Sequence, residues 1–367
     1  MNIKTLLYTI SRLGVGALFV FSGLVKLNDP IGTAIKMEEY FDVFSTDFAS
    51  FFAYLEPYAL VVALFVIILE VVLGIALLIN YQMKLMSWVL LLLMVFFTFL
   101  TGYSAILNKV TDCGCFGDFI KLTPWQSFNK DLILMVFVLI IFVVQFKIAL
   151  PRPRMWKDLS IGGAIILNLI IGIVAIEHLP YFDFRAYKVG TDIPAAMQPS
   201  EPLRYVYIME KDGEEQRFEN YPMEPGYTFK EMKLLNENAR PKITDYSIWN
   251  DEGDMTEDSF QGNKLIIVVH DITHTDRDSY ADINKLVDGL EGYADVWALT
   301  AANSQDFEAF RHEVQLATPY YFADATVLKT IIRSNPGIFL MKEGVVLGKW
   351  HHNDVPEAAT IIELIQQ

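Results

Sequence analysis

The chain has 367 residues and a formal net charge of −15, and this charge belongs entirely to its second half. Residues 1–180 carry 12 acidic and 12 basic side chains, whereas residues 181–367 carry 32 acidic and 17 basic ones. A surface this acidic argues against nucleic acid or anionic lipid as a partner of the second half. That half is long enough to build a core of its own.

Five apolar stretches in the first half each reach or approach the ~20 residues that a helix needs to cross a bilayer. The first is long for a signal peptide and is followed by four more, so we expect it to be retained. The sequence therefore predicts a multi-pass membrane protein in contact with the lipid bilayer. The five stretches are residues 8–27, 59–80, 84–107, 130–150 and 158–179.

Basic residues near the ends of these stretches indicate the orientation, because short cytoplasmic loops are rich in Lys and Arg. The loops on the opposite side of the membrane are acidic and include the cysteine loop. The chain after residue 180 lies on that side as well. We expect a cytoplasmic N-terminus in a bacterial inner membrane, with the cysteine loop and the second half in the periplasm. The basic residues are Lys4, Arg12, Lys84, Lys147, Arg152, Arg154 and Lys157.

The two cysteines of the chain, Cys113 and Cys115, lie one glycine apart between the third and fourth apolar stretches. Alpha carbons at this spacing can fall within the roughly 4.4–6.8 Å that a disulfide permits, and such a strained ring is oxidising. Asp112 and Asp118 beside them disfavour a thiolate. Redox exchange, a structural clip and a metal shared with another chain all remain open. The chain itself predicts no complete metal site.

Glu70 lies in the middle of the second apolar stretch. A carboxylate there costs about 2.5–3.5 kcal/mol on insertion scales, so it should face the bundle interior. It is either a proton-carrying or ligand-binding group, or a structural partner of Ser22, Lys26 or Tyr103.

Several of these features together resemble the DoxX-like membrane proteins, and the MauE (methylamine utilisation) branch in particular. They are Ser22-Gly23 with Lys26 and Asp29-Pro30, the mid-span Glu70 followed by Gly74, and the string Cys-Gly-Cys-Phe-Gly. The resemblance covers residues 5–150. It implies a four-helix bundle similar to quinone-linked enzymes of disulfide formation, with a thioredoxin-like partner and periplasmic client proteins.

The second half predicts an α/β domain, because strands and helices alternate in it. Residues 204–221 indicate a hairpin appended to this domain. The alternation then runs through strands at 264–270, 294–300 and 320–324, helices at 279–290, 304–312 and 327–333, and a terminal hairpin and helix.

The order of these elements resembles a thioredoxin fold of the TlpA type, in which Asn335-Pro336 falls at the cis-proline position. The place of the catalytic Cys-x-x-Cys holds Asp271-Ile-Thr-His instead. We therefore expect this domain to dock a partner beside Pro336 without exchanging thiols. His274 is a candidate remnant of a polar site, or else a solvated loop residue.

The sequence therefore predicts four parts of the chain. They are a membrane bundle (1–150), a fifth crossing helix (151–180), a linker with a hairpin (181–240) and a thioredoxin-like domain (241–367). One hypothesis for the whole is a quinone-linked thiol–disulfide oxidoreductase acting through Cys113 and Cys115. The alternative is a non-catalytic scaffold or accessory subunit of a cell-envelope complex.

Overall fold

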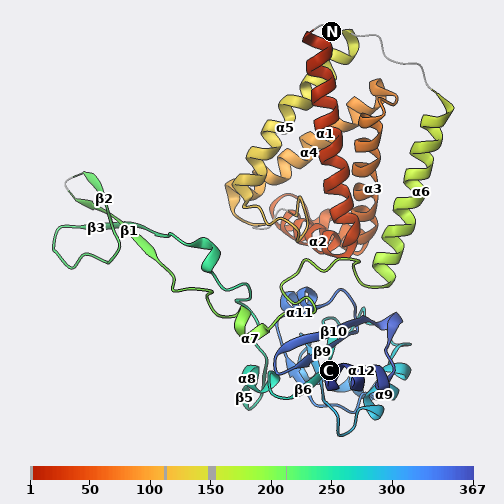
Figure 1. The fold of residues 1–367 in the computed structure, drawn as a ribbon, viewed down its shortest axis with the longest axis vertical. Coiled ribbons are helices and arrows are strands. Elements are labelled where there is room, and N and C mark those ends of the chain that lie inside the picture. The colour runs from red at the N-terminus through yellow and green to blue at the C-terminus, as the bar shows by residue number, and fades with distance from the viewer. Residues whose placement is uncertain (1–2, 111–113, 148–153, 212) are drawn as a thin grey trace. The chain divides into compact units, whose positions relative to one another are not determined.

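The computed structural model describes residues 3–110, 114–147, 154–211 and 213–367 of the chain. The chain divides into two compact units, residues 1–184 and residues 185–367. The first is helical and the second combines sheets with helices (Figure 1).

In the described part of the first unit, five helical segments are long and apolar enough to cross a membrane. This confirms the five predicted spans and the multi-pass membrane character of the chain. The helices of this unit are α1 (Ile3–Asn28), α2 (Pro30–Asp47), η1 (Ser50–Tyr58), α3 (Ala59–Leu78), α4 (Met83–Leu107), α5 (Pro124–Val144), η2 (Gln145–Lys147) and α6 (Met155–Glu177).

Four of these helices form a bundle in which α1 packs against α3 and α5, and α4 packs against α5 (Figure 1). Helix α6 lies against α3 and α1. The residues that face inward are mostly apolar, such as Phe19, Leu73, Leu90 and Ile141. Many apolar side chains of α5 and α6 point outward instead, which suits contact with lipid rather than with water.

Glycines bring α1 and α3 close together at the level of the polar residues described below. A Cβ atom on Gly74 would lie 2.7 Å from the backbone nitrogen of Val20 and 2.8 Å from the carbonyl oxygen of Gly16. Small residues of this kind allow the backbones of membrane helices to approach each other.

Gly74→Ala is therefore expected to lower the stability of the helical unit by about 1–3 kcal/mol, because the added methyl group must push the two backbones apart. Gly14→Ala is the matched control, since a Cβ atom there meets nothing within 4 Å. Thermal unfolding of the two variants in detergent measures the difference. Equal melting temperatures would contradict the close approach.

Helix α5 begins with a complete capping box. The Thr123 hydroxyl accepts a hydrogen bond from the Gln126 backbone, and the Gln126 side chain accepts one from the Thr123 backbone. Pro124 occupies the first turn, where its missing N–H is not needed. The start of α5 is thus well defined, and Lys130 and Asp131 follow one to two turns later.

The described residues of the second unit form a seven-stranded sheet in the order β10-β9-β6-β7-β8-β4-β5. Strands β6, β7 and β8 are parallel, whereas β9 is antiparallel to β6 and to β10. The strands are β4 (Trp249–Asn250), β5 (Gly253–Asp254), β6 (Asn263–Val269), β7 (Asp295–Thr300), β8 (Tyr320–Phe322), β9 (Gly337–Lys342) and β10 (Val345–His351).

Helices cover this sheet, so that central strand β6 is buried from Lys264 to Val269. Its alternate residues Leu265 and Ile267 share a core with Phe307 of α10 and Ile361 of α12. This confirms an α/β domain in the second half. The helices are α7 (Ile193–Ala196), α8 (Thr256–Ser259), α9 (Tyr280–Gly289), α10 (Ser304–Glu313), α11 (Ala325–Ile331) and α12 (Ala358–Gln366), with short turns η3 (Glu237–Ala239) and η4 (His352–Asp354).

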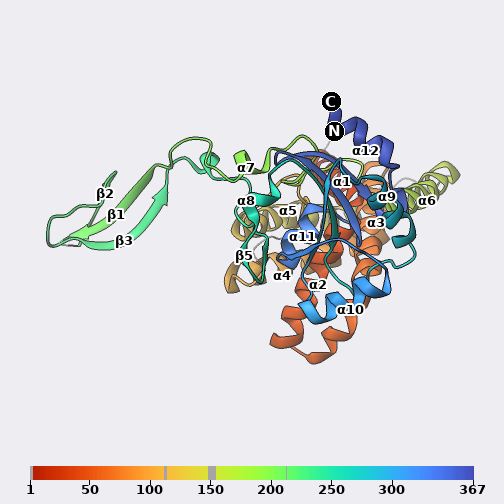
Figure 2. The ribbon, with the colours of Figure 1, turned by 90° about the horizontal axis from the view of Figure 1, so that it is seen from below.

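A separate antiparallel sheet, ordered β2-β1-β3, precedes this domain (Figures 1 and 2). The predicted hairpin is confirmed by β1 (Tyr205–Lys211) and β2 (Glu214–Phe218). Strand β3 (Thr228–Leu234) was not predicted; it pairs with the other edge of β1.

Candidate functional site

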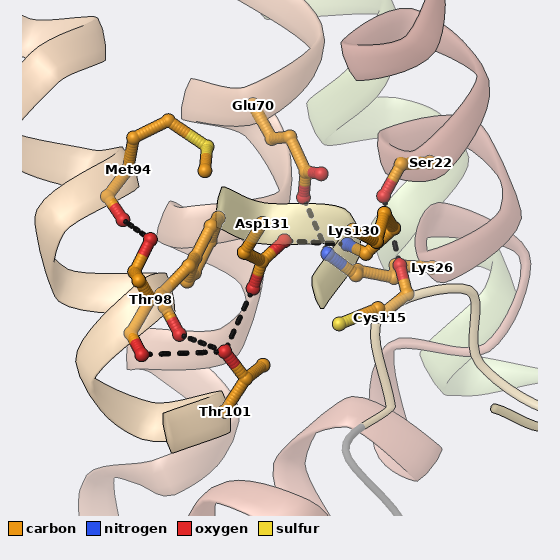
Figure 3. Close-up of polar contacts among 10 residues, drawn as sticks. Ser22, Lys26, Glu70, Met94, Thr98, Thr101, Cys115, Lys130 and Asp131 are labelled. Atoms are coloured by element: carbon orange, nitrogen blue, oxygen red, sulfur yellow. Dashed lines mark hydrogen bonds and ion pairs between the residues drawn. The ribbon is translucent and has the colours of Figure 1, made fainter. Parts of the chain in front are cut away.

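A buried ion pair joins α1 to α3 in the helical unit (Figure 3). The Lys26 Nζ donates a hydrogen bond to Glu70 Oε2 at 2.7 Å. The residues are only 8 % and 3 % exposed. Lys26 also lies over the ring of Phe97, 5.3 Å from its centroid. Of the three partners predicted for Glu70, the structure therefore selects Lys26.

A second ion pair lies on α5, with Lys130 Nζ 2.7 Å from Asp131 Oδ1. The other Asp131 oxygen accepts a hydrogen bond from Thr101 Oγ1 of α4 at 2.9 Å. Asp131 is buried, and Lys130 lies over the ring of Phe116 at 5.3 Å. Figure 3 shows both ion pairs in one region of the bundle. We call Lys26, Glu70, Lys130 and Asp131 the four-charge cluster.

The cysteine loop lies beside this cluster and is held there by Cys115 and Phe116. The Cys115 carbonyl oxygen accepts a hydrogen bond from Ser22 Oγ at 2.8 Å, and Ser22 lies one turn before Lys26 on α1. The next residue of the loop, Phe116, places its ring 5.3 Å from the Lys130 ammonium. Ser22 thus holds the loop. The predicted pairing of Ser22 with Glu70 is not found, because Glu70 binds Lys26 instead. Cys113 lies outside the described residues.

Tyr103 does not join the four-charge cluster either. Its hydroxyl donates a hydrogen bond to the Asp47 carboxylate at the end of α2, where Lys109 also binds. The hydrogen bonds from Lys109 and then Tyr103 lower the pKa of Asp47 below its ordinary value. The predicted pairing of Tyr103 with Glu70 is therefore wrong, because Asp47 offers a partner at the helix end.

In the second unit, the predicted docking residues lie on two loops that are joined to each other. The Asn335–Pro336 peptide bond is cis, as predicted. The Asn335 side-chain amide donates to the Asp271 backbone carbonyl at 2.6 Å, and the Asn335 backbone carbonyl accepts from the Asp276 backbone N–H at 2.9 Å. The loop of residues 271–276 is thereby held beside Pro336.

His274 lies on the outside of this loop, with its side chain 84 % exposed. Its Nδ1 is 2.8 Å from Asp271 Oδ2 and 2.9 Å from Thr273 Oγ1. Partial burial acts to raise the pKa of Asp271, but hydrogen bonds from Thr273 and His274 outweigh it and lower that pKa well below its ordinary value. His274 thus stabilises the loop as well as facing solvent.

His270, directly after β6, is a buried titratable group for which no role was predicted. Burial, followed by the nearby charge of Lys329, lowers its pKa to about 4. Its Nδ1 has no hydrogen-bond partner among the described residues. His270 is therefore neutral in the folded protein at neutral pH.

Lys130, Asp131 and Thr101 were also missed as site residues. The only signal in the sequence was a pair of opposite charges, Lys130 and Asp131, at the start of an apolar stretch. Such a pair is equally typical of the ordinary boundary of a membrane span. Among the described residues, no group of three or more His, Cys, Asp and Glu side chains gathers as a metal site would require.

Comparison with known proteins adds one finding. No curated protein and no solved structure matches the chain. Residues 4–145 match the family model described as Methylamine utilisation protein MauE. The matched segment runs from the second residue of α1 to the end of α5, and hence includes all members of the four-charge cluster and both cysteines. The membrane bundle of this chain is therefore similar to the MauE family.

Proposed function

We propose that the protein supports thiol–disulfide exchange at the membrane through Cys113 and Cys115. The observation that carries this proposal is the position of the cysteine loop beside the four-charge cluster, with the Cys115 carbonyl bonded to Ser22 and the Phe116 ring over Lys130. A loop that served only as a covalent clip would not need buried charges beside it, where each charge is costly.

The chemistry is an exchange of one disulfide for another. A thiolate of a partner protein attacks the Cys113–Cys115 disulfide and forms a mixed disulfide. A second partner thiolate then displaces it, so that the partner gains a disulfide and both cysteines leave as thiols with one proton each. The partner is oxidised by two electrons and the cysteine pair is reduced by two.

Regeneration of the cysteine disulfide requires a two-electron acceptor, for which we propose a quinone. When bound, a quinone supplies two-electron, two-proton redox chemistry. The donor set fits such a head group, because Lys26 and Lys130 are hydrogen-bond donors for carbonyl oxygens and the rings of Phe97 and Phe116 lie against them. Glu70 and Asp131 hold these two ammonium groups in place.

The orientation we propose places the cysteine loop and the second unit in the periplasm of a bacterial inner membrane. Its support is the excess of Lys and Arg at the opposite helix ends, including the cluster between α5 and α6. An oxidising compartment is where a disulfide in this loop would persist.

We further propose that the second unit is a thioredoxin-like domain that docks a periplasmic client or partner. Its support is the parallel β6-β7-β8 arrangement, the antiparallel β9-β10 hairpin and the cis peptide bond before Pro336. Because residues 271–274 contain no cysteine, this domain would bind without exchanging thiols.

A non-catalytic scaffold is the second candidate function. The observation in its favour is that the sequence contains only two cysteines, so no second pair exists to relay electrons. In that case Cys113 and Cys115 would close a clip, and the acidic second unit would recruit a partner in the cell envelope.

Thiol trapping in native membranes separates the two functions. We expect the redox state of Cys113 and Cys115 to follow that of the respiratory quinone pool, and Cys113→Ser/Cys115→Ser to lower the oxidised fraction of periplasmic thiol proteins. Membranes with the pool held oxidised serve as the control. A pair that stays oxidised throughout, with no effect of the double substitution, would favour the scaffold.

A further inference from the structure

Two cations from different helices meet at the end of α3. The Arg12 guanidinium of α1 donates hydrogen bonds to the carbonyl oxygens of Leu77 and Leu78, the second at 2.8 Å. The Lys157 ammonium of α6 donates to the carbonyl oxygen of Asn80 at 2.9 Å. The Asn80 backbone N–H is itself bonded to the Leu77 carbonyl, so both cations lie on one turn of the chain.

The helix end does not balance these charges. A helix C-terminus carries roughly half an elementary negative charge, whereas Arg12 and Lys157 carry a full positive charge each. Arg154, which precedes α6, adds a third cation, and its backbone carbonyl accepts from the Lys157 N–H at 2.8 Å. Within the described residues, none of the three forms an ion pair with a carboxylate. The Asp158 carboxylate follows directly in the chain and accepts a hydrogen bond from Tyr81, so positive charge is left over.

Part of this positive charge is buried, where an unpaired cation is costly. Lys157 is only 6 % exposed, and its ammonium lies 5.6 Å from the centroid of the Trp156 ring. The Arg12 Nε is buried and has no hydrogen-bond partner within the described residues. Arg154 is exposed, so a ligand can reach it directly. A bound anion would supply the missing negative charge.

The surroundings of these cations suit a lipid. The Trp156 ring is half exposed at the same helix end, and such rings lie at the boundary between lipid and water. Helix α6 lies at the periphery of the helical unit (Figure 1). Ile161 and Ala164 follow Lys157 on the same face of α6, one and two turns further on, and both are only partly buried. Cations beside apolar surface match the phosphate and acyl chain of one molecule.

We propose that Arg12, Arg154 and Lys157 bind the phosphate of an anionic phospholipid, whose acyl chain lies along Ile161 and Ala164. Basic residues between membrane helices are typical binding sites for anionic head groups. The lipid would add its contacts to the hydrogen bond that joins Lys157 of α6 to the end of α3. This site shares no residue with the four-charge cluster, so the inference does not depend on the proposed thiol exchange.

The test compares phosphatidylglycerol with phosphatidylcholine of the same acyl chains, bound to the full chain in detergent and measured by native mass spectrometry. We expect phosphatidylglycerol to bind about tenfold more tightly or better, and Arg154→Gln and Lys157→Gln each to weaken its binding about fivefold. Lys157→Arg should retain tight binding, because it keeps the charge. Lys121→Gln, which removes an exposed lysine from the loop before α5, is the matched control and should change nothing.

Arg154→Gln leaves the hydrogen bonds of Arg12 and Lys157 to α3 in place, so it reports on lipid binding without loosening that helix end. Unchanged phosphatidylglycerol binding in this variant, or equal binding of the two lipids by the wild type, would overturn the proposal. Inorganic phosphate added in excess should not displace the lipid, because it has no acyl chain. Displacement by phosphate would instead show a site for a free anion and overturn the assignment to a lipid.

Discussion

Glu70→Gln should destabilise the helical unit by about 3–5 kcal/mol, because it leaves the Lys26 ammonium buried without its carboxylate. The two groups are 2.7 Å apart and almost completely buried. Lys26→Met should have a similar effect, since the carboxylate would then be the uncompensated group. The measurement is thermal unfolding of each variant in detergent, followed by circular dichroism.

Two further variants make this experiment decisive. Lys26→Met/Glu70→Leu removes both charges and should recover most of the lost stability, as buried pairs replaced by apolar residues often do. Glu56→Gln removes an exposed carboxylate from η1 and should change little. If Glu70→Gln melted together with Glu56→Gln, the ion pair would not stabilise the bundle.

The second unit should lose stability on mild acidification because of His270. Its pKa is about 4 in the folded protein, whereas an ordinary histidine has a value of 6.5. Above pH 6.5 both folded and unfolded states are neutral, so His270 has no effect there. Below that pH the unfolded state takes up the proton first, which costs the folded state about 2 kcal/mol by pH 5 and about 3 kcal/mol by pH 4.

His270→Leu should remove most of this loss between pH 7.5 and 5, and it should not destabilise the domain at pH 7.5, because the His270 Nδ1 makes no hydrogen bond within the described residues. His312→Asn is the control, since that side chain is 79 % exposed. The remaining slope in His270→Leu is expected from His352, whose pKa is also lowered by burial. Parallel pH profiles of wild type and His270→Leu, followed by tryptophan fluorescence, would contradict this account.

The membrane helices could be predicted from the sequence because their signal is local. A run of about 20 apolar residues must be helical where lipid offers no hydrogen bonds to the backbone. The structure places the starts and ends of these helices within a few residues of the predictions, apart from α1 and α5. Helix α1 begins five residues earlier than predicted, and α5 both begins and ends six residues earlier. Polar residues such as Lys130 mask the beginning of α5.

Strand β3 was not predicted because its sequence has no strong local signal. Its side chains are almost all exposed, so its sequence has no buried face to produce a pattern. Strands β4 and β5 are only two residues long each and exist through pairing with each other and with β8. Such strands depend on contacts that the local sequence does not encode.

The candidate site could be predicted only in part. The cost of a charge in lipid predicts that Glu70 needs a partner. Of the three candidates, Lys26 is that partner. The choice depended on which residues the close α1–α3 approach brings to the same level. Lys130 was not connected with the cysteine loop, because Phe116 reaches it only after the loop folds back onto α1 and α5.

The order of the charges along the chain has a consequence for how the protein enters its membrane during synthesis. Lys26 precedes Glu70 by 44 residues, so the helix with the ammonium is made before the helix that carries the carboxylate. An isolated α3 would meet an insertion cost of about 2.5–3.5 kcal/mol for Glu70. With α1 already in the bilayer, the carboxylate finds its counter-charge there, and the two helices are best inserted as a pair. Helix α5 needs no such helper, because Lys130 and Asp131 neutralise each other on the same segment.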